Sequence, residues 1–274
     1  MDLQLNGKSA VVTGASMGIG KGIARALARE GVDVAICARH KDVLDAAAEE
    51  IRRESGRKVL AIPADLTKRE DAERFVEGAA RQFGRIDILV NNAGSAPGGV
   101  LEALDEDAWM QGLQLKFMGY VRCLRAALPI MKKQGGGRVL NLIGNDGVKD
   151  SYWEIVPGAC NAAGQNLTKA LAGQYGKFNI SFVAVNPGPV RTERWSGLVK
   201  AMARDMKLTY EQADQLAPRS IPLGRIAEVE EVANLCAYLA SPLAHFVNGT
   251  MIEIDGGQQK ALMDAARGGG ARPA

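Results

Sequence analysis

The sequence predicts a doubly wound α/β fold, in which helices cover both faces of a parallel sheet. Short runs that are apolar at every position alternate with longer amphipathic stretches along most of the chain. Such runs are typical of strands buried on both faces, and right-handed helical crossovers join these strands in parallel. With 274 residues, 47% of them hydrophobic, the chain can bury one large core without disulfides or metals.

Seven apolar runs are expected to form the strands, over residues 9–12, 32–37, 59–62, 86–90, 138–143, 180–185 and 250–254. The amphipathic stretches between them predict helices over 18–30, 41–55, 68–82, 109–133 and 158–175.

The chain is expected to form a single domain over residues 1–262. No linker rich in Pro, Gly or Ser occurs before the end of the sequence, where residues 263–274 are expected to be a flexible tail. Residues 192–222 lack strand character and are longer than most connections, so they are predicted to be a lid or substrate loop.

The composition excludes several classes of protein. Lys and Arg exceed Asp and Glu by 34 − 31 = 3, which is too small a surplus to indicate a nucleic-acid or membrane-surface partner. No long apolar segment or signal-peptide pattern occurs, so a cytoplasmic location is expected. The four cysteines lack metal-ligand or disulfide spacing, and no metal is expected. The expected partner is a small-molecule substrate.

A glycine-rich turn, Thr13-Gly14-Ala15-Ser16-Met17-Gly18-Ile19-Gly20, follows the first predicted strand and opens the first predicted helix. Glycines allow a tight turn in which backbone N–H groups approach a pyrophosphate at the helix N-terminus. A strand before and a helix after give the motif the context of a dinucleotide site. The alternative is a purely structural turn.

The chain resembles the short-chain dehydrogenase/reductase family over about residues 5–260. The matching motifs, in order, are the glycine turn, Asp65-Leu66, Asn91-Asn92-Ala93-Gly94, Asn186-Pro187-Gly188 with Thr192, and Asp255-Gly256-Gly257. The resemblance implies a Rossmann-type domain that binds a nicotinamide dinucleotide. It also implies a homo-oligomer, a dimer or tetramer, formed through the helices around Lys116 and Ala163.

The residues expected to bind this cofactor are Gly14, Ser16, Met17, Gly18, Ile19, Gly20, Arg39, Asp65, Leu66, Asn92, Ala93, Gly94, Pro187, Gly188, Val190 and Thr192. NAD-preferring sites usually place an acid at the end of the second strand, and here Ala38 stands at that position. Arg39 follows it and could grip a 2′-phosphate bidentately, with a further hydrogen bond from Ser16. NADP(H) is therefore expected to bind in preference to NAD(H). The alternative interpretation is that Arg39 is merely a solvated loop residue.

The family's catalytic Asn, Ser, Tyr and Lys fall on Lys116, Gly144, Pro157 and Asn161. Gly144 and Pro157 carry no side-chain proton, so the resemblance does not carry the family's acid–base chemistry to this chain. The sequence thus resembles a divergent member without the usual catalytic set. Asn and Lys are exchanged reciprocally at two of these positions, which would keep a cation near the nicotinamide ribose.

Four residues are candidates for catalysis: Lys116, Asn161, Asn145 and Tyr152. Lys116 lies in an apolar segment that should lower its pKa, making it a proton donor or relay. Its alternative is a structural lysine. Asn145 could orient a carbonyl and Tyr152 could supply a displaced phenol, although loop packing is the favoured interpretation of Tyr152. Asp146 is interpreted as a turn residue.

The leading hypothesis is an NADP(H)-dependent oxidoreductase that acts on a small carbonyl, alcohol or enone substrate through a non-standard proton donor. A second hypothesis is a non-redox enzyme, such as a lyase, isomerase or dehydratase. A third is a catalytically silent dinucleotide-binding protein. Fold alone does not decide among them.

Overall fold

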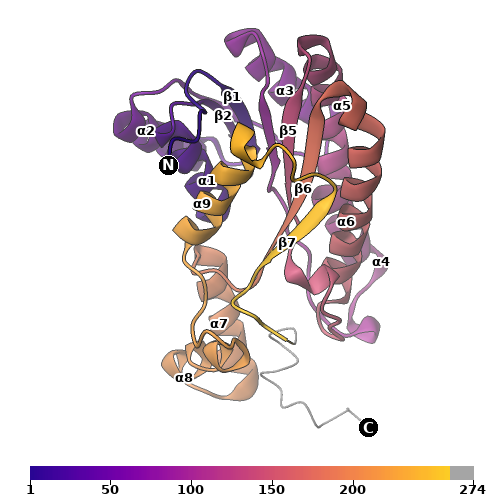
Figure 1. Cartoon of the computed structure of the whole chain (residues 1–274). Helices are drawn as coiled ribbons and strands as arrows, with labels where there is room; N and C mark the ends of the chain where they lie inside the picture. The colour runs from indigo at the N-terminus through magenta and orange to yellow at the C-terminus, as the bar shows by residue number, and fades with distance from the viewer. Residues whose placement is uncertain (260–274) are drawn as a thin grey trace.

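The computed structural model describes residues 1–259, and the predicted tail at 263–274 lies outside them. Seven parallel strands form one sheet in the order β3-β2-β1-β4-β5-β6-β7 (Figure 1). The strands are β1 (Ser9–Thr13), β2 (Asp33–Ala38), β3 (Val59–Pro63), β4 (Ile88–Asn91), β5 (Gly137–Leu142), β6 (Ile180–Pro187) and β7 (Thr250–Ile254). The sheet confirms the predicted doubly wound α/β fold, because the order reverses direction beside β1.

Helices cover both faces of this sheet. The helices are α1 (Gly18–Arg29), α2 (Lys41–Ser55), α3 (Arg69–Phe83), α4 (Glu106–Gly112), α5 (Met118–Gln134), α6 (Ile155–Tyr175), α7 (Glu193–Met206), α8 (Tyr210–Asp214) and α9 (Val229–Ala240). One apolar core joins α1, α2 and α9 to the sheet, and a second joins α3, α5 and α6 to the opposite face (Figure 1).

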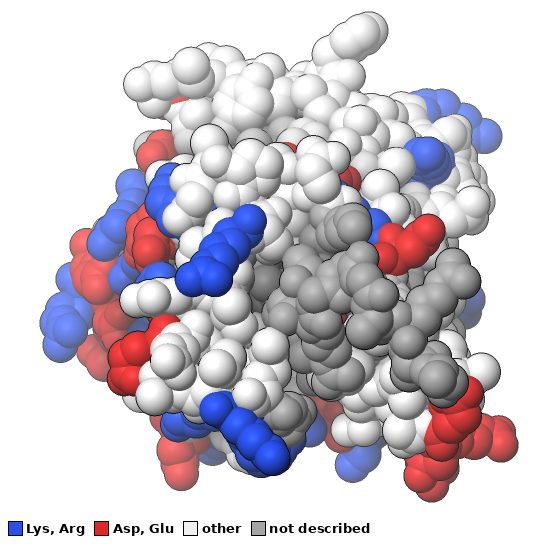
Figure 2. Space-filling view, turned by 90° about the horizontal axis from the view of Figure 1, so that it is seen from below, with Lys and Arg blue, Asp and Glu red and all other residues white. Residues whose placement is uncertain are grey.

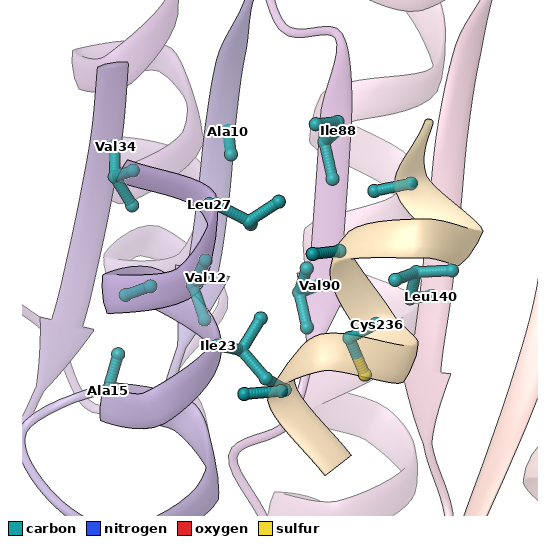
Figure 3. Packing of buried hydrophobic residues seen from close by; sticks show 14 of the residues in the cluster. Ala10, Val12, Ala15, Ile23, Leu27, Val34, Ile88, Val90, Leu140 and Cys236 are labelled. Atoms are coloured by element: carbon teal, nitrogen blue, oxygen red, sulfur yellow. The ribbon is translucent and has the colours of Figure 1, made fainter. Parts of the chain in front are cut away.

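Alternate residues of each strand point into one or the other of these two cores. Ala10 and Val12 of β1 point toward α1 and α9 (Figure 3), whereas Val11 lies in the core on the other face. Side chains alternate between the faces of a strand, so a strand buried on both sides must be apolar at every position. This requirement is the physical reason for the uninterrupted apolar runs in the sequence.

Two segments differ from the sequence expectation. The fourth strand begins at Ile88 rather than at residue 86, directly after Asp87, whose carboxylate accepts from the Ser9 backbone and from Arg85. The long helix expected over 109–133 is instead α4 and α5, joined by the π-helical segment Leu113–Phe117. The sequence pattern did not predict helix α9. In the structure, α9 packs more extensively on α1 than on any strand.

The segment predicted as a lid is helical rather than irregular. Helices α7 and α8 bury their own apolar cluster, which includes Trp195, Val199 and Met202. Trp195 is 4% exposed and donates from Nε1 to Asp214 Oδ1 at 2.7 Å. Trp195 therefore packs within this segment instead of standing exposed at its surface.

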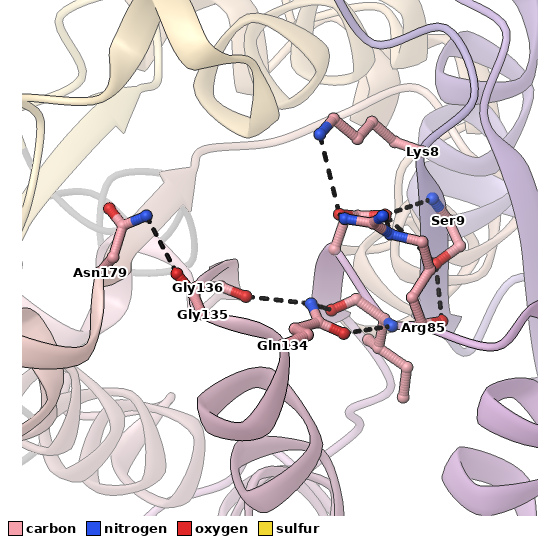
Figure 4. A network of polar contacts seen from close by, with 9 residues as sticks. Lys8, Ser9, Arg85, Gln134, Gly135, Gly136 and Asn179 are labelled. Atoms are coloured by element: carbon pink, nitrogen blue, oxygen red, sulfur yellow. Dashed lines mark hydrogen bonds and ion pairs between the residues drawn. The ribbon is translucent and has the colours of Figure 1, made fainter.

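A polar network closes the amino-terminal edge of the sheet (Figure 4), at the end opposite α7 and α8 (Figure 1). The Arg85 guanidinium makes two hydrogen bonds to Asp87, and the same carboxylate accepts from the Ser9 backbone at 2.9 Å. Gln134 joins this edge through the backbone of Ile86. These contacts fasten the loop before β4 to β1 and to the end of α5, far from the glycine-rich turn.

Candidate functional site

The candidate site lies at the carboxyl-terminal edge of the sheet, where α/β proteins bind ligands at the reversal of strand order. Figure 2 looks onto this end of the molecule. Lys and Arg side chains on this face lie apart from one another, several of them beside Asp or Glu.

The glycine-rich turn brings the backbone of β1 against the loop after β4. Gly14 has φ +64°, and a Cβ atom there would lie 2.8 Å from Ala93 Cα. At Gly20 a Cβ atom would lie 2.3 Å from the Gly14 carbonyl oxygen. Only glycine fits at these two positions, because the available space excludes a side chain at both and the positive φ disfavours one at Gly14.

The N-terminus of α1 is suited to an anion. The residue before it, Met17, makes no capping hydrogen bond through its side chain, and the first turn contains no acidic residue. Backbone N–H groups at the start of a helix lack intrahelical partners and carry partial positive charge. This end of α1 can therefore hold the pyrophosphate that the sequence motif predicted.

Asn92 and Thr13 lock the loop that follows β4. The Thr13 hydroxyl accepts hydrogen bonds from the backbone N–H groups of Asn92 and Ala93 at 2.8 and 2.9 Å. The Asn92 side chain donates to the carbonyl oxygens of Thr13 and Gly14. The predicted residues Asn92, Ala93 and Gly94 thus lie directly beside the glycine turn.

The residues predicted for the adenosine end lie after β2 and β3. Arg39 is exposed directly after β2, while Leu66 is buried. Asp65 accepts from the Thr67 hydroxyl at 2.8 Å and so shapes the turn that presents Leu66. Ser16 is half-buried in the glycine turn. Arg39 can reach outward to a phosphate without first breaking an ion pair, since none is formed by it in the described structure.

The residues predicted for the nicotinamide end follow β6. The Gly188 backbone donates to the Ile254 carbonyl oxygen at 3.1 Å, and Val190 pairs with Ala227. Thr192 caps α7 by accepting from the backbone of Trp195. A Cβ atom at Gly18 would lie 3.4 Å from Thr192 Cγ2, so the start of α7 stands beside the start of α1.

Lys116 lies in the π-helical segment, and its Nζ donates to the Ile143 carbonyl oxygen at 2.9 Å. Burial lowers the pKa of Lys116, and the charge of Asp146 opposes this effect in part. π-Helical turns frequently occur at functional sites. The lowered pKa agrees with the prediction from the apolar segment around Lys116.

Asn161 is fully buried on α6 and donates from Nδ2 to Asp146 Oδ1 at 2.7 Å. Its Oδ1 atom has no hydrogen-bond partner in the structure. Buried polar atoms are usually satisfied, so an unpartnered acceptor suggests that a bound molecule supplies the missing donor. A ribose hydroxyl is such a donor, and this atom therefore fits the dinucleotide implied by the resemblance.

Asn145 faces the end of the sheet at β7. Its Nδ2 donates to Gln258 Oε1 at 2.8 Å and to Asp255 Oδ2 at 3.3 Å. The same carboxylate forms an ion pair with Lys149. The loop after β5 is thus fastened to the Asp255-Gly256-Gly257 motif, and any substrate contact of Asn145 has to be made through its oxygen.

Tyr152 and Trp153 stand at the outer side of the site. The Tyr152 side chain is 44% exposed. The Trp153 ring covers Gly98, where a Cβ atom would lie 2.1 Å from the ring, and its backbone carbonyl accepts from Gly99 at 2.7 Å. Trp153 also packs on the apolar cluster of α7 and α8. The loop after β4 and the lid therefore meet at Trp153.

Sequence reasoning missed three parts of this site. Asp146, interpreted as a turn residue, contacts the buried Asn161, and Lys149 and Gln258 complete the cluster around Asp255. The matched Asp255-Gly256-Gly257 motif located the position of this cluster but not the residues that it binds. Nothing in local periodicity could have paired residues more than a hundred positions apart.

Comparison with known proteins agrees with this geometry. The chain matches the family model described as enoyl-(acyl carrier protein) reductase over residues 14–259. The chain belongs to the short-chain dehydrogenase/reductase family.

Two relatives and one solved structure illustrate this membership. The chain is 34% identical over 251 residues to the 3-oxoacyl-(acyl-carrier-protein) reductase FabG of Staphylococcus epidermidis, covering 91% of this chain and 98% of the relative. It is 30% identical to the NADPH-dependent reductase BacG of Bacillus subtilis, and the match covers 93% of this chain and 99% of the relative. The structure of L-sorbose reductase of Gluconobacter frateurii, solved with NADPH and L-sorbose, matches this chain with a TM-score of 0.91 at 33% identity. The match covers 96% of this chain and 100% of the reductase chain.

These similarities support a general oxidoreductase activity for this family member. Within residues 1–259 the structure contains no group of three or more His, Cys, Asp or Glu residues placed to bind a metal. The helices in that range are also too short or too polar to cross a membrane.

Proposed function

We propose that this protein is an NADP(H)-dependent oxidoreductase that acts on a small carbonyl, alcohol or enone substrate through a proton-transfer arrangement different from that of its family. The observation that carries the proposal is the uncapped N-terminus of α1 facing the same edge of the sheet as Lys116. A nicotinamide dinucleotide bound at this edge of the sheet would supply or accept a hydride through its nicotinamide ring. FabG, BacG and L-sorbose reductase support the assignment through the reductase activity that their names state, the latter two with NADPH named.

In this proposal one set of residues binds the dinucleotide and Lys116 transfers the proton. The α1 amides hold the diphosphate, and Arg39 holds a 2′-phosphate at the end of β2. Ser16, Asp65 and Leu66 contact the adenosine half.

The nicotinamide half lies against the loops after β4 and β6. Pro187, Gly188, Val190 and Thr192 form one side of this site, and Asn161 Oδ1 accepts from a ribose hydroxyl. Asn92 to Gly94 contact the ribose side of adenosine, beside the glycine turn.

Lys116 is the group proposed to donate or relay the proton. Gly144 and Pro157 offer no proton at the positions where the family has its Ser and Tyr, so the chain is proposed to lack the usual set. The lowered pKa of Lys116 brings its proton within reach of an alkoxide formed by hydride addition. Asn145 and Tyr152 are proposed as further contacts of the substrate.

Two measurements test the proposal. Tryptophan-to-nicotinamide fluorescence transfer during titration should show NADPH binding about tenfold tighter than NADH, or about 1.4 kcal/mol. Lys116→Ala should then lower NADPH oxidation with an active carbonyl or enone by about 10²–10⁴-fold while NADPH binding persists. Lys133→Ala, at an exposed site on α5, is the matched control. Absence of binding by either nucleotide would contradict the proposal.

We further propose a cytoplasmic homo-oligomer, a dimer or tetramer. Helix α6 presents exposed small residues, Ala159, Ala162 and Gly173, that permit close approach of another helix. Sedimentation velocity of the purified chain tests this proposal, and a monomer at micromolar concentration would contradict it.

A further inference from the structure

The space next to Gly144 is filled by two polar side chains from elsewhere in the chain. Gly144 has φ +128°, and a Cβ atom built on it would lie 2.7 Å from Asp146 Oδ1 and 2.7 Å from Asn161 Nδ2. Gly144 is the position at which the family carries its serine. The hydrogen-bonded pair of Asp146 and Asn161 therefore occupies the volume that the serine side chain would need.

This exchange changes the chemistry of the position. A serine hydroxyl can donate a hydrogen bond to a carbonyl oxygen, whereas an ionised carboxylate only accepts. The family's phenol is absent as well, since Pro157 has no side-chain donor. The position that usually stabilises an oxygen anion now carries a negatively charged group.

The neighbouring cations do not neutralise Asp146 by direct contact. Lys116 Nζ is directed to the Ile143 carbonyl oxygen, and the Arg194 guanidinium donates to the Gly94 carbonyl oxygen at 3.3 Å. Among the residues that the structure describes, no hydrogen bond or ion pair joins either cation to Asp146. One oxygen of Asp146 is held by Asn161, which leaves the carboxylate oriented and without a cation in contact.

A carboxylate at this place opposes one reaction and favours another. Hydride addition to a ketone creates an alkoxide, which a nearby negative charge destabilises. Hydride addition to a protonated imine instead removes a positive charge, and a nearby carboxylate stabilises that cationic substrate. The imine also brings an N–H donor, which a carboxylate accepts.

We propose that this site reduces protonated imines in preference to ketones, with the Asp146 carboxylate accepting from the imine N–H. The inference rests on the oxidoreductase function proposed above and names its substrate class. The imine carbon gains a hydride from the reduced nicotinamide, and a new C–H bond forms. The C=N π electrons become the nitrogen lone pair, so the products are a neutral amine and the oxidised nicotinamide. No proton donor is needed in this step, which accounts for the loss of both family hydroxyls; the Lys116 proton proposed above is used only in the slower reduction of carbonyls.

The test compares Asp146→Asn with the matched control Asp150→Asn, which lies exposed on the same loop. The first readout is binding without turnover, by fluorescence titration of the NADP⁺-loaded protein. Methylpyrrolidine, a cation at neutral pH, is compared with the uncharged methylcyclopentanol. The second readout is NADPH oxidation with methylpyrroline and dihydroisoquinoline, against methylcyclopentanone and tetralone.

The wild type and Asp150→Asn are expected to bind the cation about tenfold more tightly than the alcohol and to reduce the imines about tenfold faster than the ketones. Asp146→Asn, which keeps an amide oxygen to accept from Asn161, is expected to lose both preferences while retaining NADPH affinity. Asp146→Ser, a second variant without charge, should lose the same preferences and also some stability, because it removes the acceptor of Asn161.

Three outcomes would overturn the inference. These are an unchanged cation preference in folded Asp146→Asn, faster reduction of the ketones by the wild type, and turnover of neither class by NADPH-loaded protein. Failure of the wild type to bind NADPH is a separate result, because it removes the oxidoreductase proposal on which the inference rests.

Discussion

Asn161 on α6 donates a 2.7 Å hydrogen bond to Asp146 in the turn after β5, and this contact fixes how the turn lies on the helix. Asn161 is fully buried, so this hydrogen bond is shielded from bulk water. The contact is tight because Gly147 brings the turn backbone against α6, where a Cβ atom at Gly147 would lie 2.6 Å from Asn161 Cβ.

Asn161→Ala should lower the free energy of unfolding by about 1–3 kcal/mol, because it deletes a buried hydrogen bond to a charged group. Urea unfolding followed by circular dichroism measures the change. Asn166→Ala, on the exposed side of the same helix, is the control and should change stability little. An equal effect of both substitutions would show that helix propensity, rather than the buried contact, is responsible.

Gly144→Ser should destabilise the protein instead of restoring a family-like site. The added Cβ atom would contact both Asp146 and Asn161, and a φ of +128° is unfavourable for any residue with a side chain. We expect a loss of about 1–3 kcal/mol in thermal or urea unfolding. Gly173→Ser, where nothing lies within 4 Å of an added Cβ, should be tolerated. A gain in both stability and ketone reduction by Gly144→Ser would contradict this account.

Arg39→Asp should remove the preference for NADPH. The substitution replaces a cation that faces a 2′-phosphate with an acid that accepts from a ribose 2′-hydroxyl. We expect the NADPH-to-NADH affinity ratio to fall by about tenfold or more, measured by fluorescence titration. Arg53→Asp, at an exposed position on α2, should leave the ratio unchanged. An unaltered ratio in Arg39→Asp would leave Arg39 a solvated loop residue.

Lys116 should make stability depend on pH. Burial lowers the pKa of Lys116 in the folded state, so the unfolded chain binds the proton more tightly. Between the lowered value and the ordinary lysine pKa, the unfolded state carries more protons, and stability therefore rises as pH increases. Lys116→Met should flatten this rise when urea unfolding is measured from neutral pH to about 10. Lys133→Met should retain it; an identical profile for Lys116→Met would mean that Lys116 titrates normally.

Asp255→Ala should be the most damaging of these substitutions. It removes the partner of Lys149 and an acceptor of Asn145, in a cluster where the Asp255 and Lys149 side chains are only 6% and 15% exposed. Leaving one buried charge without its partner costs about 3–5 kcal/mol. Chemical denaturation measures the loss, with Asp150→Ala as the exposed control. A loss below about 1 kcal/mol would place the pair effectively in solvent.

The sequence predicted the sheet well because burial on both faces forces a strand to be apolar throughout, and such runs are visible in one dimension. All seven expected strands are present, with shifts of one or two residues at several ends. The glycine turn was also predictable, since its backbone angles and close approach to Ala93 require glycine. The lowered pKa of Lys116 followed from its apolar neighbours in the chain.

The rest of the site depends on contacts that no local pattern encodes. The pairing of Asp146 with Asn161 arises because Gly144 leaves space that a side chain would otherwise fill. The turn of π-helix around Lys116 has no compositional signal, so the sequence suggested one continuous helix. The helices of the lid were missed because their apolar residues pack on one another instead of on the sheet.

That separate packing has a consequence for how the protein can change. Helices α7 and α8 derive their order from their own small core around Trp195, while the sheet derives its order from the two large cores. Substitutions on the outer surface of the lid therefore leave the folding of the sheet nearly untouched. If the segment contacts the substrate, as the lid prediction proposes, a new specificity can be selected there without first stabilising the sheet.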